Sequence, residues 1–394
     1  MAKGLALGLA LFGAVLASGE ALAQRDPLGG QFGAIEVALT PAEAAKDVQL
    51  MGEAVAKLAP QRPGVVDTYV LSASFWNDPV FENEASEAAN ILANRYDAAD
   101  RTIVLSAGRG ARLPRSYPSA SPNNFNAAIG AIGKVMDPKE DLLVVFVTSH
   151  GGPDGAVGIQ EAGRMGGALR ALHLRTALQQ AGVGAKLVII SACFSGHFIL
   201  PFSDPDTVVL TAAAADKTSF GCEPSRDWTF FGDALFNHAM RGGEGVIASF
   251  DEARDIISKW EGDMHDGWQA KPQSVRAHEQ EPLASNPQKA AGERALSVIA
   301  SAERYGNSIA CAAHLSFALD RAKTGRPLKG LADVNALTSA LASATSRANE
   351  QGQARNRSSQ ETGKAIAAAS ATALQVYLGQ QEYVTGHATG CLAP

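Results

Sequence analysis

The chain has 394 residues, of which 46% are hydrophobic and 19% charged, and its formal net charge is −6 at pH 7. A chain of this length and composition can bury a large core and is long enough for two domains. The acidic balance and the lack of a dense lysine and arginine run exclude nucleic acid as the main partner, because phosphate binding needs a basic surface.

The N-terminus has the pattern of a secretory signal. Lys3 precedes an apolar stretch over residues 4–17, and the small residues Ala21 and Ala23 suit cleavage before Gln24. A membrane anchor is the alternative, but the stretch is shorter than the roughly 20 residues that a spanning helix needs. No later segment is apolar for long enough to cross a bilayer. We therefore expect an exported mature protein, periplasmic or secreted, with no membrane span after signal cleavage.

Beyond the signal, the sequence predicts alternating helices and buried strands. A Gly-rich arm over residues 24–37 leads into a helix over 41–58, with Pro41 in its first turn. The predicted strands are residues 65–71, 102–105, 141–150, 186–193 and 207–211. The predicted helices are residues 82–96, a segment after Asn124, and residues 166–180, 230–240 and 250–260. This alternation is typical of an α/β fold with a doubly wound, mostly parallel sheet and helices on both faces.

The composition changes after about Ser274, where Ala-rich segments replace strands. No strand is predicted beyond this point, and the polar residues 347–363 predict a linker or a frayed helix end. Apolar residues fall on two helical stripes: Val334, Leu337 and Leu341, and Ile366, Ala369, Ala373 and Val376. We predict a signal over residues 1–23, an N-terminal arm and helix over 24–62, an α/β domain over 63–275 and a helical C-terminal domain over 276–394.

Two of the predicted strands end in residues of complementary chemistry. His150 and Cys193 close consecutive strands, and parallel strands joined by a crossover helix end at one edge of a sheet, where open α/β folds bind ligands. A thiol beside an imidazole is a nucleophile with its base. Each residue taken alone is more often structural, since free cysteine packs as a small hydrophobe. Their joint placement favours a catalytic pair.

Small residues surround both candidates. Gly151 and Gly152 follow the histidine and let backbone amides approach a substrate closely. The N–H groups of Gly151 and Cys193 could therefore form an oxyanion hole. Ser191 and Ala192 precede the thiol and keep the strand end narrow enough for a peptide to lie across it.

Three other kinds of site have weaker support. His197 lies four residues after Cys193 and would face it on a helix, but nothing around it offers a glycine-lined cleft. A metal site built on these two residues lacks further ligands at a useful spacing. Ser195 stands in Cys-Phe-Ser-Gly and not in a Gly-x-Ser-x-Gly elbow. The sequence implies no metal and no organic cofactor.

The four cysteines are too few for a disulfide scaffold. If Cys193 stays free, at most one bridge forms among Cys222, Cys311 and Cys391. We favour Cys311 with Cys391, because both lie in the C-terminal region and an exported chain can keep a disulfide. Cys222 has no adjacent histidine, which favours packing over chemistry for this thiol.

Around these residues the chain resembles the legumain-like cysteine peptidases, in particular their bacterial members, within the wider caspase-like clan. The similarity spans roughly residues 63–274. The matching segments are Thr148-Ser149-His150-Gly151-Gly152, Ser191-Ala192-Cys193-Phe194-Ser195-Gly196, residues 211–222, Trp228-Thr229-Phe230-Phe231-Gly232-Asp233 and Asn77-Asp78-Pro79-Val80-Phe81. The resemblance implies a caspase-like fold with His150 and Cys193 as the catalytic dyad.

Further roles are carried over from the resemblance alone. Gly151 would contribute to the oxyanion hole, and Asn77 would orient the imidazole. The primary specificity pocket would fall on Ser191, Thr218, Ser219 and Asp233. The chain departs from legumain at Ser191, where legumain has an acidic residue, and at Pro79, near the place of its pocket arginine. Asparagine specificity is therefore not implied, and Asp233 suits a helix first turn as well as a pocket.

The sequence thus predicts an exported cysteine endopeptidase, or a transpeptidase of the same chemistry, that acts on a peptide or protein substrate. A catalytically silent caspase-like binding or regulatory protein is the alternative, because fold alone never proves activity. Two roles remain for the C-terminal helices, which follow the junction Ala277–Pro287. They are either an autoinhibitory cap, as the helical C-terminal segment of legumain is, or a domain for stability or partner binding.

Overall fold

The computed structural model describes residues 35–36, 39–109, 116–161, 165–241, 244–379 and 381–392. The predicted secretory signal and most of the Gly-rich arm lie outside these ranges. Within them, none of the helices is both long enough and apolar enough to span a membrane.

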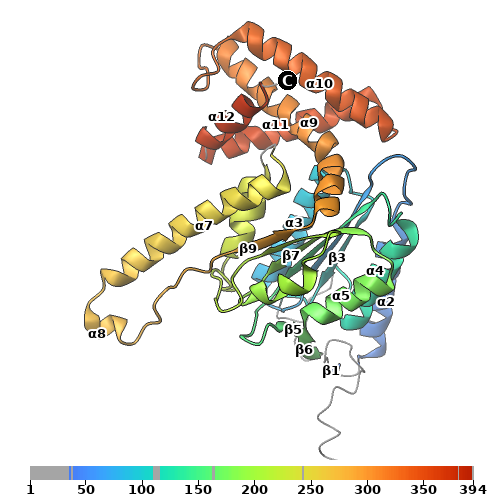
Figure 1. Ribbon diagram of the computed structural model, residues 1–394, viewed down its shortest axis with the longest axis vertical. Coiled ribbons are helices and arrows are strands. Elements are labelled where there is room, and N and C mark those ends of the chain that lie inside the picture. The colour runs from blue at the N-terminus through green and yellow to red at the C-terminus, as the bar shows by residue number, and fades with distance from the viewer. Residues whose placement is uncertain are drawn as a thin grey trace, which may run out of the picture.

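A six-stranded sheet forms the centre of the molecule, in the order β3-β2-β4-β7-β8-β9 (Figure 1). The first five strands are mutually parallel, as predicted, and β9 pairs antiparallel with β8. Their bounds are β2 Thr68–Ser74, β3 Thr102–Ser106, β4 Leu142–Thr148, β7 Ala185–Ser191, β8 Thr207–Thr211 and β9 Gln288–Ala291. Every residue of β2, β4, β7 and β8 is buried, because helices cover both faces of the parallel part. The predicted α/β class is therefore confirmed.

Each face of the sheet has its own hydrophobic core. On one face pack α2 (Pro41–Ala56), α4 (Pro122–Val135) and α5 (Ala171–Gln180), together with the short 3₁₀ helices η1 (Ser195–Phe198) and η2 (Leu200–Phe202). On the other face pack α3 (Pro79–Arg95), α6 (Phe230–Gly232), the π-helical turn η3 (Asp233–His238), η4 (Ala239–Arg241) and α7 (Val246–Gln269). The short α8 (Gln273–Arg276) follows α7.

A second, smaller sheet lies at the end of the molecule where His150 is found. It joins β1 (Ile35–Glu36), β6 (Met165–Leu169) and β5 (Val157–Glu161) as antiparallel strands. The prediction of one helix over residues 166–180 is thus wrong for its first part, and only α5 remains helical. The sequence has Gly166-Gly167 here, and paired glycines disfavour a helix interior.

The sheet continues beyond Ser274, where no strand was predicted. Strand β9 is only four residues long, and its pattern Gln-Lys-Ala-Ala carries no apolar alternation, so sequence periodicity could not identify it. The first half of the next helix, α9 (Glu293–Lys323), packs Ala295, Ile299 and Ala302 into the sheet's core. The α/β core therefore extends past residue 275, while independent folding of the two predicted domains stays a prediction.

The C-terminal helices form a separate core. The second half of α9, together with α10 (Val334–Ala354), α11 (Ser359–Gly379) and α12 (Gln381–Gly390), surrounds buried residues such as Leu315 and Leu337. Both predicted stripes face cores within this assembly, although the side chain of Val376 is outside the described part. Most of the polar segment 347–363 belongs to α10 and α11, so the linker is only a few residues long.

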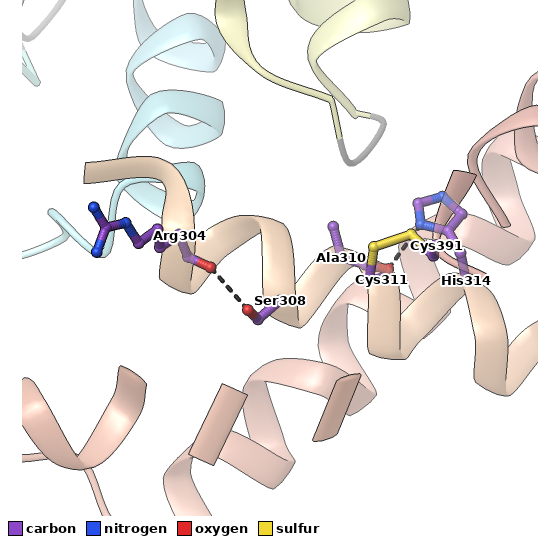
Figure 2. Close-up of a disulfide and its surroundings, with 6 residues drawn as sticks. All are labelled: Arg304, Ser308, Ala310, Cys311, His314 and Cys391. Atoms are coloured by element: carbon purple, nitrogen blue, oxygen red, sulfur yellow. Dashed lines mark hydrogen bonds between the residues drawn. A yellow bond between two sulfur atoms is a disulfide. The ribbon is translucent and has the colours of Figure 1, made fainter. Parts of the chain in front are cut away.

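A disulfide joins Cys311 on α9 to Cys391 after α12, with 5.4 Å between the two Cα atoms (Figure 2). The predicted pairing is confirmed, and Cys193 and Cys222 are free thiols. The bridge closes the helical assembly, because it fixes the end of the described chain to the helix that also packs on the sheet.

The helical assembly attaches to the edge of the sheet where the strands begin. Arg62, before β2, donates to the carbonyl oxygen of Arg355 at 2.7 Å, and Arg357, between α10 and α11, pairs with Asp97, before β3. His150 and Cys193 follow the opposite ends of the strands, and the two regions lie far apart in Figure 1. The C-terminal helices thus attach at the strand edge opposite the one that carries the candidate site, and an autoinhibitory role for them stays a prediction.

Candidate active site

Strands β4 and β7 bring His150 and Cys193 to one edge of the sheet. The parallel register pairs Thr148 with Ser191, so His150 and Cys193 each lie two residues beyond a matched pair. Because side chains alternate between the two faces of a strand, His150 follows the direction of Thr148 and Cys193 follows that of Ser191. Both are partly exposed, with 40% of the His150 side chain accessible. The two candidates are thus presented side by side to solvent.

The backbone of Gly151 packs directly on that of Cys193. A Cβ atom added at Gly151 would overlap the carbonyl oxygen of Cys193 and approach its carbonyl carbon to 2.8 Å. Only glycine allows two backbones to approach this closely. The glycine that follows the histidine is therefore required by the junction between the two strand ends.

The N–H group of Gly151 points away from the neighbouring hairpin. Gly151 bridges Val157 in an antiparallel pair, and the hydrogen bonds flank this pair, from Gly158 N to His150 O and from Gly152 N to Ala156 O. At such a non-hydrogen-bonded position the N–H is directed outward from the partner strand. The Gly151 N–H therefore does not hydrogen-bond to this hairpin, which meets one requirement of an oxyanion-hole donor.

The Cys193 sulfur contacts the chain segment that carries Ser219. Ser219 N donates to Cys193 Sγ at 3.3 Å, and the Ser219 hydroxyl lies 3.6 Å from the same sulfur. The next residue, Phe194, has the left-handed backbone conformation with φ 57°, which is uncommon without glycine. Its N–H donates to Lys217 O at 2.7 Å, which holds the turn after the thiol. Among the described residues, the sulfur contacts Ser219 and makes no hydrogen bond to His150, as is common without substrate.

The His150 imidazole stands between two aromatic rings and a carboxylate. Trp76 and Phe81 meet it edge to face at centroid distances of 5.0 and 4.9 Å. Asp78 Oδ2 lies 3.6 Å from His150 Nε2. Sequence analysis favoured Asn77 for the orienting role, but its Oδ1 is buried without a hydrogen-bond partner among the described residues. The carboxylate beside the imidazole belongs to the next residue, Asp78.

Asp78 was missed because it has a second, ordinary explanation. It is the N-cap of α3, a position that aspartate commonly fills, and Pro79 follows at the first helical position. In the structure the Asp78 side chain makes no capping hydrogen bond. Its carboxylate is therefore available to the imidazole.

The predicted pocket residues separate into two groups. Ser219, and Thr218 beside it, lie in the segment over the thiol. Ser191 is only 2% exposed, and its hydroxyl lies 3.1 Å from that of Thr229. It faces the interior below the thiol and does not reach an open pocket.

Asp233 has partners from its own helical turn. Asn237 donates to its Oδ1 at 2.8 Å, and His238 Nε2 lies 3.4 Å from the same oxygen. Partial burial raises the pKa of Asp233, but the hydrogen bonds from His238 and Asn237 outweigh it and lower the pKa below its ordinary value. Asp233 is therefore an anion at neutral pH, in the first turn of η3.

Sequence analysis did not identify Glu84, a fully buried carboxyl on α3. Thr229 Oγ1 donates to it at 2.7 Å, Ser191 Oγ at 3.3 Å, and Thr148 Oγ1 donates to its other oxygen. Burial raises its pKa to about 7, although these three hydroxyls act in the opposite direction. The available signal was a glutamate on the apolar stripe of a predicted helix, between Phe81 and Ala88.

The remaining candidates lie beside the site. His197 is exposed on η1, with its ring against Gly155 in the turn after β4. Cys222 lies close to Ser219, and burial raises the pKa of its thiol. A partly buried thiol with a raised pKa is a poor nucleophile, which favours the packing role expected for Cys222.

A parallel sheet with helices on both faces, and with histidine and cysteine at the ends of adjacent strands, defines the caspase-like class of α/β proteins. The model of the peptidase C13 family, the legumain family, matches residues 120–276, which include both candidates. The resemblance to legumain-like cysteine peptidases is thereby confirmed for this part of the chain. No curated protein matches the chain.

Proposed function

We propose that the protein is a cysteine endopeptidase with Cys193 as the nucleophile and His150 as the general acid and base. The main support is the contact of Gly151 with the Cys193 backbone, because this contact fixes the two strand ends beside each other. The match of residues 120–276 to a cysteine peptidase family supports the same chemistry.

The reaction uses groups at this edge of the sheet. Cys193 gives its thiol proton to His150 and its Sγ attacks the scissile carbonyl, while the N–H groups of Gly151 and Cys193 stabilise the oxyanion. His150 gives a proton to the leaving amine, which leaves a thioester on the sulfur. Water activated by His150 then releases the acyl group and frees the thiol. An amine in place of water would give transpeptidation.

The specificity differs from asparaginyl cleavage in this proposal. Ser191, at the place of legumain's acidic pocket residue, is buried and hydrogen-bonded to Glu84. The Asp233 carboxylate already has Asn237 and His238 as partners. The Ser219 hydroxyl, 3.6 Å from the sulfur, is left as the polar side chain beside it, with Thr218 next in the chain, and we propose that these hydroxyls select a polar side chain at the cleaved position.

Export completes the proposal. Its support is the N-terminal apolar segment over residues 4–17 and the Cys311–Cys391 disulfide, since structural disulfides persist mainly outside the cytoplasm. Localisation of the tagged full-length chain, with N-terminal sequencing of the product, tests this part. Cleavage before Gln24 is the expected result.

The test of catalysis is a peptide library on the protein that begins at Gln24. Hydrolysis that is abolished by Cys193→Ala and kept by Cys222→Ala supports the proposal, because the control removes the other free thiol. If well-folded protein hydrolyses no peptide of the library, the result favours a binding or regulatory protein. The second candidate stays open because the side chains of Ser191 and Asp233, two predicted pocket residues, already have hydrogen-bond partners within the protein. Adding an amine acceptor and analysing products by mass separates hydrolysis from ligation.

A further inference from the structure

Glu84 is a buried carboxyl whose hydrogen bonds all come from hydroxyl groups. Its residue is 0% exposed, and its three donors are Thr148, Ser191 and Thr229. No cation lies within salt-bridge distance of it among the described residues. Burying an ionisable group without a counter-charge is costly, so such a group marks a role other than stability.

Two of the three donors belong to the catalytic strands. Thr148 is the last residue of β4 and lies two residues before His150; Ser191 is the last residue of β7 and lies two residues before Cys193. The register pairs these two donors with each other. Glu84 therefore links the two strands through residues that lie two positions before each member of the proposed dyad.

The third donor ties the next helix to the same carboxyl. Thr229 is the N-cap of α6, and its hydroxyl also accepts from Gly232 N at 3.1 Å. A Cβ atom at Gly232 would overlap Glu84 Oε1, so the glycine provides the space for the carboxyl. Asp233, the predicted pocket residue, follows directly.

We propose that Glu84 is the positioning residue of the site: its carboxyl holds β4, β7 and the start of α6 in one arrangement, which fixes His150 against Cys193. This inference rests on the proposed peptidase function. Glu84 acts through Thr148, Ser191 and Thr229 and does not touch the substrate.

The ionised form suits this role better than the neutral form. A carboxylate accepts from all three hydroxyls at once, whereas a protonated carboxyl carries a donor that needs an acceptor of its own. The titratable groups that face Glu84 are Asp233 on η3 and Cys222 in the preceding loop, and the Asp233 charge raises the Glu84 pKa further. Because that pKa is about 7, positioning improves as pH rises through neutrality.

The experiment compares wild-type protein with Glu84→Gln across pH. Glutamine keeps the volume but has a single acceptor oxygen, so it resembles the protonated carboxyl. Glu261→Gln is the matched control, since Glu261 is also buried, has a raised pKa and lies on α7, bound to Ser285 N. The readouts are kcat and KM for a cleaved peptide, and the alkylation rate of Cys193 by iodoacetamide, followed on the Cys193 peptide by mass spectrometry.

The expected ratio of wild-type to Glu84→Gln kcat is near one at about pH 5.5 and rises to about tenfold or more at about pH 8, with KM unchanged. A ratio that stays flat and equals that of Glu261→Gln overturns the positioning role. If wild-type protein cleaves no peptide, the peptidase proposal fails and the alkylation rates decide alone. A pH-dependent ratio of alkylation rates then supports Glu84, and parallel profiles overturn it.

Thr148→Val is the second variant if Glu84→Gln does not fold. It removes one donor to the carboxyl while keeping a β-branched side chain of similar size on β4. A smaller loss of kcat with the same pH dependence is expected. Kinetics identical to wild type at every pH would reject the proposal.

Discussion

The carboxylate of Asp78 and the imidazole of His150 lie 3.6 Å apart, although one begins helix α3 and the other follows strand β4. About 30% and 40% of the two side chains are exposed, so the pair contributes little to stability. In the proposed reaction its value is orientation, because a carboxylate beside one ring nitrogen fixes the rotation of the ring and would stabilise the imidazolium form of His150.

Replacing this carboxylate tests that orientation. Asp78→Asn is expected to lower kcat/KM for a cleaved peptide by about tenfold, because an amide cannot stabilise the imidazolium charge. The melting temperature should not change, since the Asp78 side chain makes no capping bond in α3. Asp100→Asn, which removes a surface partner of Arg101, is the control and should leave both measurements unchanged. Equal kinetics for the two variants would exclude an orienting role.

Gly151→Ala is expected to remove most of the activity. The added methyl group overlaps the backbone carbonyl of Cys193, which no side-chain rotation can relieve. The displaced strand ends should reduce kcat/KM by about 100-fold and the free energy of unfolding by about 1–3 kcal/mol. Gly130→Ala on α4 meets no atom within 4 Å, so it should keep full activity and gain stability. Denaturant unfolding and peptide hydrolysis measure both effects, and an active Gly151→Ala protein would contradict the site geometry.

Opening the disulfide should affect the helical assembly and spare the site. The Cys311–Cys391 bridge has a sequence separation of 80, and its loss by Cys391→Ser should cost about 2–5 kcal/mol. Hydrogen exchange is expected to accelerate in α10 to α12 and to stay slow in β4 and β7, because the assembly attaches at the far edge of the sheet. Equal acceleration throughout would show that the two cores unfold as one.

Acid should destabilise the same assembly. His387 is 6% exposed, and burial lowers its pKa to about 4, with the nearby His314 acting in the same direction. The native state keeps this imidazole neutral while the unfolded chain protonates near pH 6.5. Stability is therefore complete above about pH 6.5 and falls by about 3 kcal/mol as pH drops to about 4. Thermal melts across this window should show the fall, and His387→Gln should reduce it; a fall of equal size in both proteins would assign it elsewhere.

Truncation after Gln280 should damage the fold and not activate the enzyme. It removes β9 from the sheet and uncovers the core that Ala295, Ile299 and Ala302 occupy on α9. We expect an aggregating or partly unfolded product, measured by size-exclusion chromatography and circular dichroism. A monomeric truncated protein with raised peptidase activity would support the cap hypothesis instead.

The parallel sheet could be predicted because its strands are continuous apolar runs, which parallel packing requires. Strands β4 and β7 begin and end within two residues of the predicted limits. The small sheet could not be predicted, since β6 consists of Met-Gly-Gly-Ala-Leu and is stabilised by pairing with β5 and not by its own pattern. Strand β9 likewise depends on its partner β8.

The strand-end residues of the site were predictable, and their supporting side chains were not. His150 and Cys193 follow recognisable buried runs, so topology alone brings them to one edge. Asp78 and Glu84 come from helix α3, whose placement against the strand ends is a tertiary property. Asp78 was concealed by its N-cap position and Glu84 by the solvent-exposed surroundings that glutamate usually has.

Strand β9 also limits the pairing of the sheet with strands of other molecules, because it covers β8. An uncovered β8 would offer unpaired amides and carbonyls along five buried residues, three of them apolar, and such an edge is where foreign strands add and fibrils grow. The four-residue β9 occupies that border, and Pro287 before it and Gly292 after it end the pairing at once. Resistance to intermolecular strand addition thus depends on a four-residue segment whose only apolar side chains are two alanines.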